Sequence, residues 1–330
     1  MSASRPNAPF ELAGELPALI DRSIMSEIRL DGRVAVVTGA GRGLGRTHAL
    51  LLAARGAQVV VNDFGGAEDT DGSPAHQVVE DIRAAGGTAV ADGTDVSTLE
   101  GASRIADLAV STYGRLDVLV NNAGILRDRT LKKISPDEVD AVLAVHLGGT
   151  IWMSKAVWPV MTAQGYGRII NTTSAAGLFG NFGQTNYAAA KAGIVGVTKT
   201  LALEGARDGI KVNAIEPAAR TRMTENLPGS LVASLDPALV APLVLWLSAE
   251  ECPATGDVYN VGGGRVAKVF VAQAPGYFAP DLSAEQIRDE WAEITNPARA
   301  VVIDDFADEL DLLAELLNPD SSRFVAWGGM

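Results

Sequence analysis

The sequence predicts an α/β fold in which a parallel sheet is covered by helices on both faces. From residue 33 onward, short runs of apolar and β-branched residues alternate with longer stretches rich in Ala and Leu. Strands that are apolar at successive positions are buried on both faces, and the helices between them supply the crossovers of a parallel sheet. Because such crossovers are right-handed, we expect a doubly wound sheet.

The strands of this sheet are expected at seven runs: residues 34–37, 59–61, 88–90, 118–120, 168–171, 212–215 and 258–261. We expect three parts in the chain, which are an N-terminal extension over 1–30, one α/β domain over 31–265 and an acidic C-terminal extension over 266–330. Met25 precedes a run that leads directly into the first strand, so residues 1–24 are either an appended segment or an ordered surface arm.

The C-terminal extension differs from the domain in charge. Residues 266–330 contain 12 acidic and 4 basic residues, so they hold −8 of the chain's net charge of −13. A loop is expected over 273–282, with helices over 283–295 and 304–317. This extension either covers a ligand pocket, packs on a neighbouring subunit or is a mobile tail.

Composition excludes several classes of function. Apolar residues make up 47% of the chain, enough for a sizeable core, and the negative net charge argues against a nucleic-acid partner. The single cysteine, Cys252, forms no intramolecular disulfide, and the three histidines follow no metal-ligand spacing, so we expect no metal site. No apolar run approaches the length of a membrane span and no secretory signal is visible, so a cytoplasmic protein without membrane partners is expected.

A glycine-rich loop, residues 38–45, follows the first strand and precedes a helix. Glycines let the backbone turn tightly and approach a pyrophosphate, while the helix offers free N–H groups and the positive end of its dipole. The loop alone is a weak signal, but its place between strand and helix is the context that dinucleotide binding requires. Its candidate cofactor-binding residues are Gly39, Arg42, Gly43, Leu44 and Gly45.

Asp63 ends the second strand and lies downstream of this loop. A carboxylate there accepts hydrogen bonds from the adenosine ribose and repels a 2′-phosphate, which favours NAD over NADP. Arg42 argues in the other direction, because a base in the loop could pair with that phosphate; we give Asp63 more weight. In the alternative interpretation Asp63 is a turn residue. Further candidates for cofactor contact follow the third and fourth strands: Asp95, Val96, Asn122, Ala123 and Gly124.

The candidate catalytic residues lie around the fifth strand and the helix after it. Tyr187 and Lys191 are four residues apart in a helical stretch and share one helix face. An ammonium beside a phenol lowers the phenol's pKa, so Tyr187 is a candidate general acid or base and Lys191 a candidate contact of the nicotinamide ribose. Ser174 precedes Tyr187 by 13 residues and could orient the reacting oxygen. The hydride itself belongs to the cofactor's chemistry.

Together these motifs resemble the short-chain dehydrogenase/reductase family over about residues 33–264. The resemblance rests on the loop at 38–45, the stretch 121–124, Ser174 and the Tyr187/Lys191 pair. It implies a seven-stranded Rossmann-like sheet in a single NAD-binding domain and a homodimer or homotetramer.

A narrower likeness is carried by the stretches 61–66, 124–129, 166–170 and 180–184. They are similar to the (3R)-hydroxyacyl-CoA dehydrogenase unit of peroxisomal multifunctional enzyme type 2, also called 17β-hydroxysteroid dehydrogenase type 4. This likeness implies NAD as cofactor and, as substrate, a 3-hydroxyacyl-CoA or a hydroxysteroid, steroid side-chain thioesters included. It also implies a stand-alone dehydrogenase, since the hydratase unit of that enzyme is not in this sequence.

Two positions depart from the wider family. His146 stands where most members have an Asn of a proton relay, so it is either a catalytic residue or a hydrogen-bonded core histidine. Pro217 is followed by Ala218 instead of the usual glycine, with Glu216 beside it, which leaves the backbone contact of Pro217 to the nicotinamide open. Thr221 is the expected contact of the nicotinamide amide.

The substrate is argued from charge. Four cations follow the fourth strand closely and could pair with CoA phosphates, or could form a solvated loop: Arg127, Arg129, Lys132 and Lys133. Apolar residues over 222–238 suit an acyl chain or a steroid, and core packing explains them equally well. The competing functions are an NADPH-dependent 3-oxoacyl carrier-protein reductase and a non-catalytic NAD(H)-binding protein.

Overall fold

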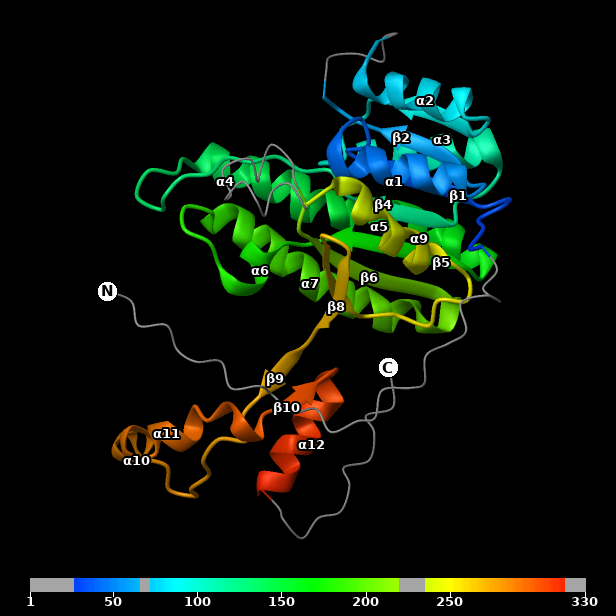
Figure 1. Cartoon of the computed structure of the whole chain (residues 1–330). Helices are drawn as coiled ribbons and strands as arrows, with labels where there is room; N and C mark the ends of the chain where they lie inside the picture. The colour runs from blue at the N-terminus through cyan, green and yellow to red at the C-terminus, as the bar shows by residue number, and fades with distance from the viewer. Residues whose placement is uncertain (1–26, 66–71, 220–234, 318–330) are drawn as a thin grey trace. The chain divides into compact units, whose positions relative to one another are not determined.

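The computed structural model describes residues 27–65, 72–219 and 235–317, which group into two units (Figure 1). The first unit, Glu27–Val269, contains an eight-stranded sheet. The spatial order of its strands is β3 (Thr88–Asp92), β2 (Gln58–Asn62), β1 (Val34–Thr38), β4 (Val118–Asn121), β5 (Gly167–Thr172), β6 (Ile210–Pro217), β7 (Val258–Gly262) and β8 (Arg265–Val269). Strands β1 to β7 are parallel, which confirms the predicted doubly wound fold.

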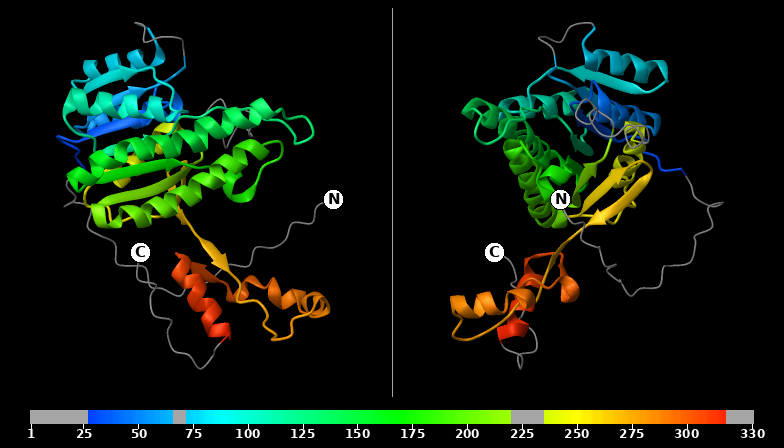
Figure 2. Two further views of the ribbon diagram at one scale, coloured as in Figure 1. Left: turned by 180° about the vertical axis from the view of Figure 1, so that it is seen from behind. Right: turned by 60° about the vertical axis from the view of Figure 1, so that its left-hand side comes forward.

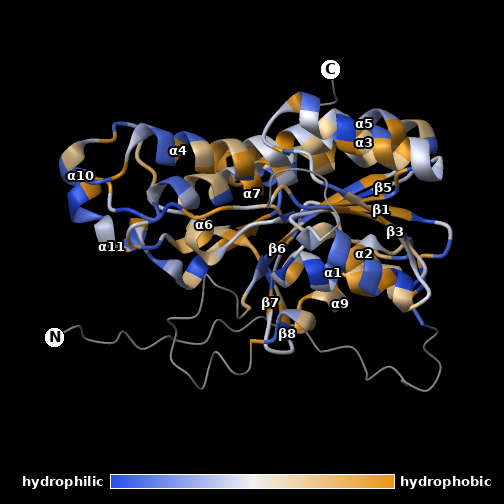
Figure 3. Ribbon diagram, turned by 90° about the horizontal axis from the view of Figure 1, so that it is seen from above, coloured by the Kyte–Doolittle hydropathy of each residue, from blue (hydrophilic) through white to orange (hydrophobic). Residues whose placement is uncertain are grey.

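Helices form a layer on each face of the sheet, as the view from above shows (Figure 3). One layer consists of α1 (Gly43–Ala54), α2 (Pro74–Ala84) and α9 (Ala241–Ser248). The other, seen from behind in Figure 2, consists of α3 (Leu99–Tyr113), α5 (Gly149–Gln164) and α7 (Thr185–Gly205). No helix among the described residues is long and apolar enough to cross a membrane.

The strand β1 shows why the sheet is buried on both faces. Ala35 and Val37 belong to the core cluster beneath α1, α2 and α9, while Val34 and Val36 belong to the cluster beneath α3 and α5. All four side chains are fully buried. Each fully buried valine contributes roughly 1.5–3 kcal/mol to folding, so the alternation fixes the strand between the two layers.

The prediction of seven strands missed β8. This strand runs antiparallel to β7 and begins where the sequence predicted the C-terminal extension. Its residues are exposed or half-buried, because it forms the edge of the sheet. This five-residue edge strand has no continuous apolar run, so the apolar pattern did not predict it.

The second unit contains residues from Phe270 onward. A two-stranded antiparallel sheet joins β9 (Val271–Gln273) to β10 (Val301–Ile303). The helices are α10 (Ala284–Asp289), α11 (Trp291–Ile294) and α12 (Phe306–Leu317), and a capping box of Ser283 and Gln286 begins α10. None of the residues 270–314 is buried, in keeping with the acidic composition of this unit.

The stretch 166–170, one of those that carried the narrower likeness, is structural. The Arg168 guanidinium is almost fully buried and donates to the carbonyl oxygens of Gly209 (3.1 Å) and Ala249 (3.2 Å). It also lies 4.2 Å from the centre of the Tyr166 ring, a cation–π contact. These bonds join the start of β5 to its neighbours, at the edge of the sheet opposite to the carboxyl ends of the strands.

Candidate active site

The glycine loop between β1 and α1 is held against the end of β4. Gly39 has φ of +62°, and a Cβ there would lie 2.7 Å from the Cα of Ala123. A Cβ on Gly45 would lie 2.2 Å from the carbonyl oxygen of Gly39, so both positions require glycine. The Asn122 amide clamps the loop by donating to the carbonyl oxygens of Thr38 (2.9 Å) and Gly39 (3.0 Å).

The other predicted residues of the glycine loop have different roles: some lie where a phosphate could bind, and one packs against the core. Gly43 has φ of +53°, is exposed and begins α1, where its surroundings are open to a ligand. Leu44 is half-buried and packs against the core cluster, so its side chain supports the loop from below. Arg42 precedes the helix and is exposed. The free N–H groups at this helix start fit a pyrophosphate.

Asp63 lies against this loop, although 22 residues separate it from Gly41. One carboxylate oxygen accepts from the Gly41 N–H at 2.8 Å, and the other accepts from the Gly65 N–H at 2.9 Å. A Cβ on Gly41 would lie 2.7 Å from the first oxygen, so glycine is needed there too. The bonds fix the carboxylate beside the loop, and each oxygen keeps acceptor capacity for a ribose hydroxyl.

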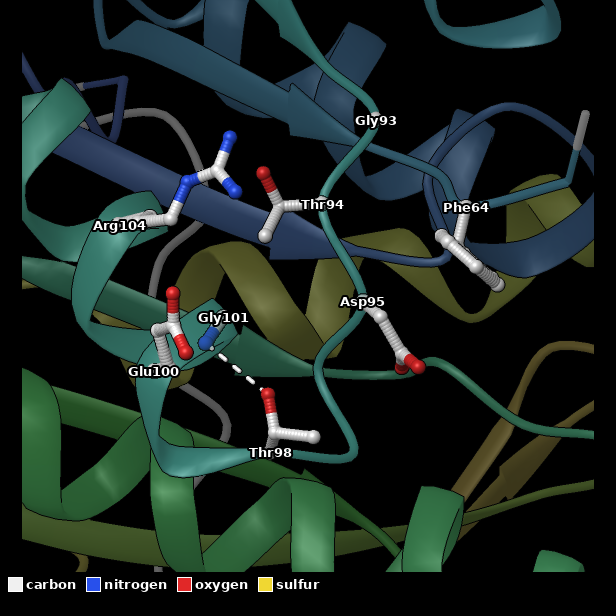
Figure 4. A pocket seen from close by; sticks show the side chains of 8 residues that line it. All are labelled: Phe64, Gly93, Thr94, Asp95, Thr98, Glu100, Gly101 and Arg104. Carbon is white, nitrogen blue, oxygen red and sulfur yellow. Dashed lines mark hydrogen bonds between the residues drawn. The ribbon is translucent and has the colours of Figure 1, made fainter. Parts of the chain in front are cut away.

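A cavity of about 380 Å³ lies beyond the ends of β2 and β3 (Figure 4). Phe64 and Asp95 line it. The Asp95 carboxylate accepts from the Ser97 N–H (2.8 Å) and hydroxyl (2.9 Å), so it shapes the turn before α3. Val96 is buried against Gly149, which leaves its backbone as the group that can meet a ligand. The sequence did not single out Phe64 as a site residue, although it is 63% exposed and lines this cavity.

Ser174 and Tyr187 come from the starts of two successive helices. Ser174 is the N-cap of α6 (Ala175–Phe179) and its hydroxyl accepts from the Ala176 N–H at 3.2 Å. Tyr187 lies in the first turn of α7 and is 8% exposed. Burial raises the pKa of the Tyr187 phenol, a hydrogen bond with Ser174 lowers it, and the Asp128 carboxylate raises it. The structure therefore brings the predicted Ser/Tyr pair together.

Lys191 lies one turn further along α7, on the same face. Its ammonium is 5.6 Å from the centre of the Tyr187 ring and donates to the carbonyl oxygen of Thr172 at 2.6 Å. Burial lowers the pKa of Lys191 to about 7. Desolvation is the largest effect on the Tyr187 phenol and raises its pKa, which opposes the lowering that the sequence interpretation assigned to the Lys191 ammonium.

Buried polar residues outside the predicted catalytic set hold α7 in place. The Asn121 amide donates to the Asn171 side chain at 2.9 Å, and the Asn171 amide donates to the Thr198 hydroxyl at 2.9 Å. This buried chain joins β4, β5 and α7 beneath the site. A Cβ on Gly177 would lie 2.7 Å from the backbone of Lys191, so α6 packs closely on α7. The sequence pattern does not reveal these roles, because asparagine and glycine are common in loops and at strand ends. The distances in the structure do reveal them.

His146 lies in a π-helical turn, η2 (Ala144–Gly148), between α4 (Pro136–Leu143) and α5. Its ring meets the Tyr187 ring edge-on, with 5.2 Å between the centres. Its Nε2 is 2.8 Å from the Ile125 carbonyl oxygen and 3.0 Å from the Ile125 nitrogen, while its Nδ1 is buried and has no hydrogen-bond partner among the described residues. Desolvation lowers the pKa of His146 to about 3, helped by the Lys191 charge, so the imidazole is neutral at neutral pH.

Gly124 makes room for this histidine. A Cβ on Gly124 would lie 2.2 Å from Cε1 of His146. Gly124 was predicted as a cofactor contact, and the structure gives it this packing role. Small side chains at Ala123 and Gly124 also leave the end of β4 open.

The end of β6 is described only in part. Pro217 is the last residue of β6, and the Ala218 N–H donates to the Val261 carbonyl oxygen at 2.8 Å. The Glu216 carboxylate accepts from the Asn260 amide at 2.9 Å, and burial raises its pKa. Thr221 and most of the apolar segment predicted over 222–238 lie outside the described residues.

The residues at the carboxyl ends of the parallel strands fit a nicotinamide dinucleotide. The helix start at Gly43 offers N–H donors to phosphates, the Asp63 carboxylate offers acceptors to ribose hydroxyls, and Lys191 offers further N–H donors. Among the described residues, no cluster of His, Cys, Asp or Glu is arranged to hold a metal ion. The site therefore combines a glycine loop suited to a dinucleotide with a Ser–Tyr–Lys group suited to proton transfer, in which Tyr187 and Lys191 are buried and Ser174 is half-buried.

Comparisons relate this chain to known dehydrogenases and multifunctional enzymes. A family model described as short chain dehydrogenase matches residues 33–230. The peroxisomal multifunctional enzyme type 2 of Mus musculus is 46% identical over 283 residues, which cover 83% of this chain and 38% of that enzyme. A hydroxyacyl-CoA dehydrogenase of Mycobacterium tuberculosis is 43% identical over 290 residues, covering 82% of this chain and 88% of that enzyme.

Among solved structures, full-length peroxisomal multifunctional enzyme type 2 from Drosophila melanogaster matches with a TM-score of 0.76 and 40% identity. The match covers 88% of this chain and 50% of that one. The chain thus spans half or less of the multifunctional relatives and most of the mycobacterial dehydrogenase.

Proposed function

Since the chain belongs to the short-chain dehydrogenase family, we propose that it is an NAD-dependent dehydrogenase of (3R)-3-hydroxyacyl-CoA thioesters. The chain is an oxidoreductase, and its fold takes a nicotinamide cofactor. The thioester class is supported by the names of the relatives, which include a hydroxyacyl-CoA dehydrogenase of nearly the same extent. A hydroxysteroid is the competing substrate.

One observation carries the proposal: Ser174, Tyr187 and Lys191 come together at the carboxyl end of the parallel sheet, the end that also carries the glycine loop. When bound, the nicotinamide supplies or accepts the hydride. The Ser174 and Tyr187 hydroxyls are the groups that would hold the substrate oxygen. In ketone reduction the Tyr187 hydroxyl gives its proton to that oxygen, and in alcohol oxidation the phenolate takes the proton.

Lys191 and His146 both lie beside the Tyr187 ring, and we assign each a part in this proton transfer. The Lys191 ammonium favours the phenolate and so supports oxidation, while its remaining N–H donors would hold the nicotinamide ribose. His146 is neutral and has one ring nitrogen engaged by the Ile125 backbone. We assign it to positioning of the Tyr187 ring rather than to a proton relay, since its other nitrogen is enclosed.

Asp63 supports NAD rather than NADP. Both carboxylate oxygens are fixed by backbone N–H groups beside the loop, so the negative charge stays where a 2′-phosphate would have to lie. Arg42 is exposed at the same loop and would favour the phosphate. The fixed carboxylate outweighs it, because a buried or half-buried charge is screened less than an exposed one.

The test is a set of initial rates with NAD and with NADP. Substrates are (3R)- and (3S)-3-hydroxybutyryl-CoA and a 17β-hydroxysteroid, all with the full chain. We expect turnover with NAD and the 3R thioester. Preference for NADP would contradict the role of Asp63 and favour a 3-oxoacyl carrier-protein reductase, and turnover of the steroid alone would replace the substrate class. Sedimentation equilibrium of the same protein tests the homodimer or homotetramer that we propose by analogy with the family.

A further inference from the structure

Two loops beside Tyr187 form a ledge, defined as residues 126–134 and 179–184. They project at the same end of the sheet unit in Figures 1 and 2. Arg129 and Gln184 form a parallel backbone bridge, and the Gln184 amide donates to the Asp128 carboxylate at 2.8 Å. The Asn186 amide, next to Tyr187, donates to the Arg127 carbonyl oxygen at 3.2 Å. The loops are therefore fixed to each other and to the start of α7.

The ledge carries an excess of positive charge on an acidic protein. Arg129 is paired with Glu138 at 3.6 Å, and the Asp128 carboxylate accepts from Gln184. The remaining three cations are exposed and, within the described part of the chain, have no acidic partner: Arg127, Lys132 and Lys133. Unpaired cations gathered on one surface attract an anionic ligand.

The same ledge exposes large apolar side chains. Phe182 is 89% exposed, Phe179 is 76% exposed and Leu131 is 73% exposed. An aromatic ring left in water beside cations has the composition of a surface that binds a phosphorylated base, because bases stack on aromatic faces while cations pair with phosphates. Core packing does not explain these residues, since they contact water.

We propose that this ledge binds the phosphoadenosine end of CoA, with Phe179 or Phe182 stacking on the adenine and Arg127, Lys132 and Lys133 pairing with the phosphates. This inference rests on the proposed thioester substrate and adds where its carrier is held. Five residues separate Phe182 from Tyr187, so the chain between them spans at most roughly 18 Å. A thioester bound at Tyr187 can therefore reach the ledge through its flexible pantetheine arm.

This nucleotide site is separate from the one for the cofactor. The cofactor's adenosine belongs beside Asp63, beyond β2 and β3, whereas the ledge follows β4 and α6. Strand β1 lies between β2 and β4 in the sheet. The carrier nucleotide and the cofactor nucleotide thus occupy opposite sides of the glycine loop.

The experiment compares two substrates that differ only in the nucleotide: 3-hydroxybutyryl-CoA and 3-hydroxybutyryl-pantetheine. In the variant Lys132→Glu/Lys133→Glu, we expect the KM of the CoA ester to rise about tenfold at low salt, and the effect to shrink as salt screens the charges. The KM of the pantetheine ester should change less than twofold. The matched control Lys155→Glu/Arg207→Glu makes the same charge change at exposed positions outside the ledge and should leave both values alone.

Phe182→Ala tests the stacking contact without risk to folding, because the ring is already 89% exposed. We expect it to raise the KM of the CoA ester about five- to tenfold and to spare the pantetheine ester. If the CoA ester and the pantetheine ester had equal KM values in wild type and in the variants, the proposal that the ledge binds CoA would be wrong. A rise in KM for an acyl carrier protein, with the CoA ester unaffected, would also overturn it by identifying a protein partner.

Direct binding separates this inference from the proposed function. Titration of the full chain with CoA in a calorimeter needs no turnover, so it tests the ledge even if neither thioester reacts. We expect Lys132→Glu/Lys133→Glu to weaken CoA binding about tenfold relative to wild type and to the Lys155/Arg207 control. Turnover of the thioesters without any effect of the ledge variants on CoA binding would leave the proposed function standing and end this inference.

Discussion

Replacing Gly124 by alanine would place a methyl group where the His146 ring lies. A Cβ on Gly124 would be 2.2 Å from Cε1 of His146 and 3.0 Å from each ring nitrogen. The ring is 2% exposed and is held at Nε2 by the backbone of Ile125, so it has no free direction in which to move. The substitution therefore forces either the ring or the end of β4 out of place.

The magnitude follows from two contributions. Overpacking of a core costs about 1–3 kcal/mol, and loss of the His146 hydrogen bond adds about 0.5–1.5 kcal/mol. We expect Gly124→Ala to lower the free energy of unfolding by about 3 kcal/mol, which for a domain of this size lowers Tm by roughly 6–12 °C. The kcat should fall as well, because the displaced ring packs edge-on against Tyr187.

Urea unfolding in a double-mutant cycle with His146→Ala provides the measurement. Without the imidazole the new methyl group meets no ring, so the cost of Gly124→Ala should drop below about 1 kcal/mol and the coupling should exceed about 1.5 kcal/mol. Gly196→Ala in α7 is the control, since a Cβ there meets open space and should stabilise the helix by about 0.5–1 kcal/mol. Additive costs across the cycle would refute the contact between Gly124 and His146.

Three further predictions address chemistry, cofactor choice and pH. Tyr187→Phe should keep cofactor binding, measured by fluorescence titration, while turnover falls at least 100-fold; turnover near wild type would contradict its role as acid or base. Asp63→Ser should reduce the preference for NAD over NADP about 10- to 100-fold in kcat/KM, because a charged hydrogen-bond acceptor is lost; an unchanged ratio would leave Asp63 a turn residue. His48 is fully buried, neither of its ring nitrogens has a hydrogen-bond partner in the part of the chain that the structure describes, and burial lowers its pKa to about 3. The unfolded chain binds its proton near pH 6.5, so stability falls as the pH drops from there toward 3, and His48→Leu should flatten this decline in urea unfolding curves; an identical decline in the variant would exclude His48 as its source.

The strands were predictable because burial on both faces leaves a local record. The four residues from Val34 to Val37 are all apolar, and this run alone predicts a strand that is covered on both faces. No such apolar run marks β8, because this strand lies at the edge of the sheet and its side chains are exposed or half-buried. The π-helical turn around His146 is equally silent, because a single five-residue turn is too short to show a period of its own.

Site residues were predictable where their chemistry is rare and hidden where their role is steric. Ser174, Tyr187 and Lys191 stand out by type and spacing, and the structure places them together. Gly124 was predicted only as a cofactor contact, and its distance to the His146 ring gives it a packing role that the sequence did not show. The ring lies 22 positions further along the chain, so no local pattern connects the two. Sequence therefore names reactive groups better than the residues that hold them.

The pKa values of Tyr187 and Lys191 show why burial matters to the chemistry. Ammonium beside phenol predicts a lowered phenol pKa, yet the structure gives a raised pKa for Tyr187 and a lowered pKa for Lys191. Desolvation opposes each charged form separately, whereas phenolate and ammonium stabilise each other when both are present. The resting pair is then neutral phenol beside an amine that titrates near neutrality. Such a phenol is ready to donate a proton in ketone reduction, and alcohol oxidation has to begin by removing that proton, so oxidation should gain relative to reduction as the pH rises.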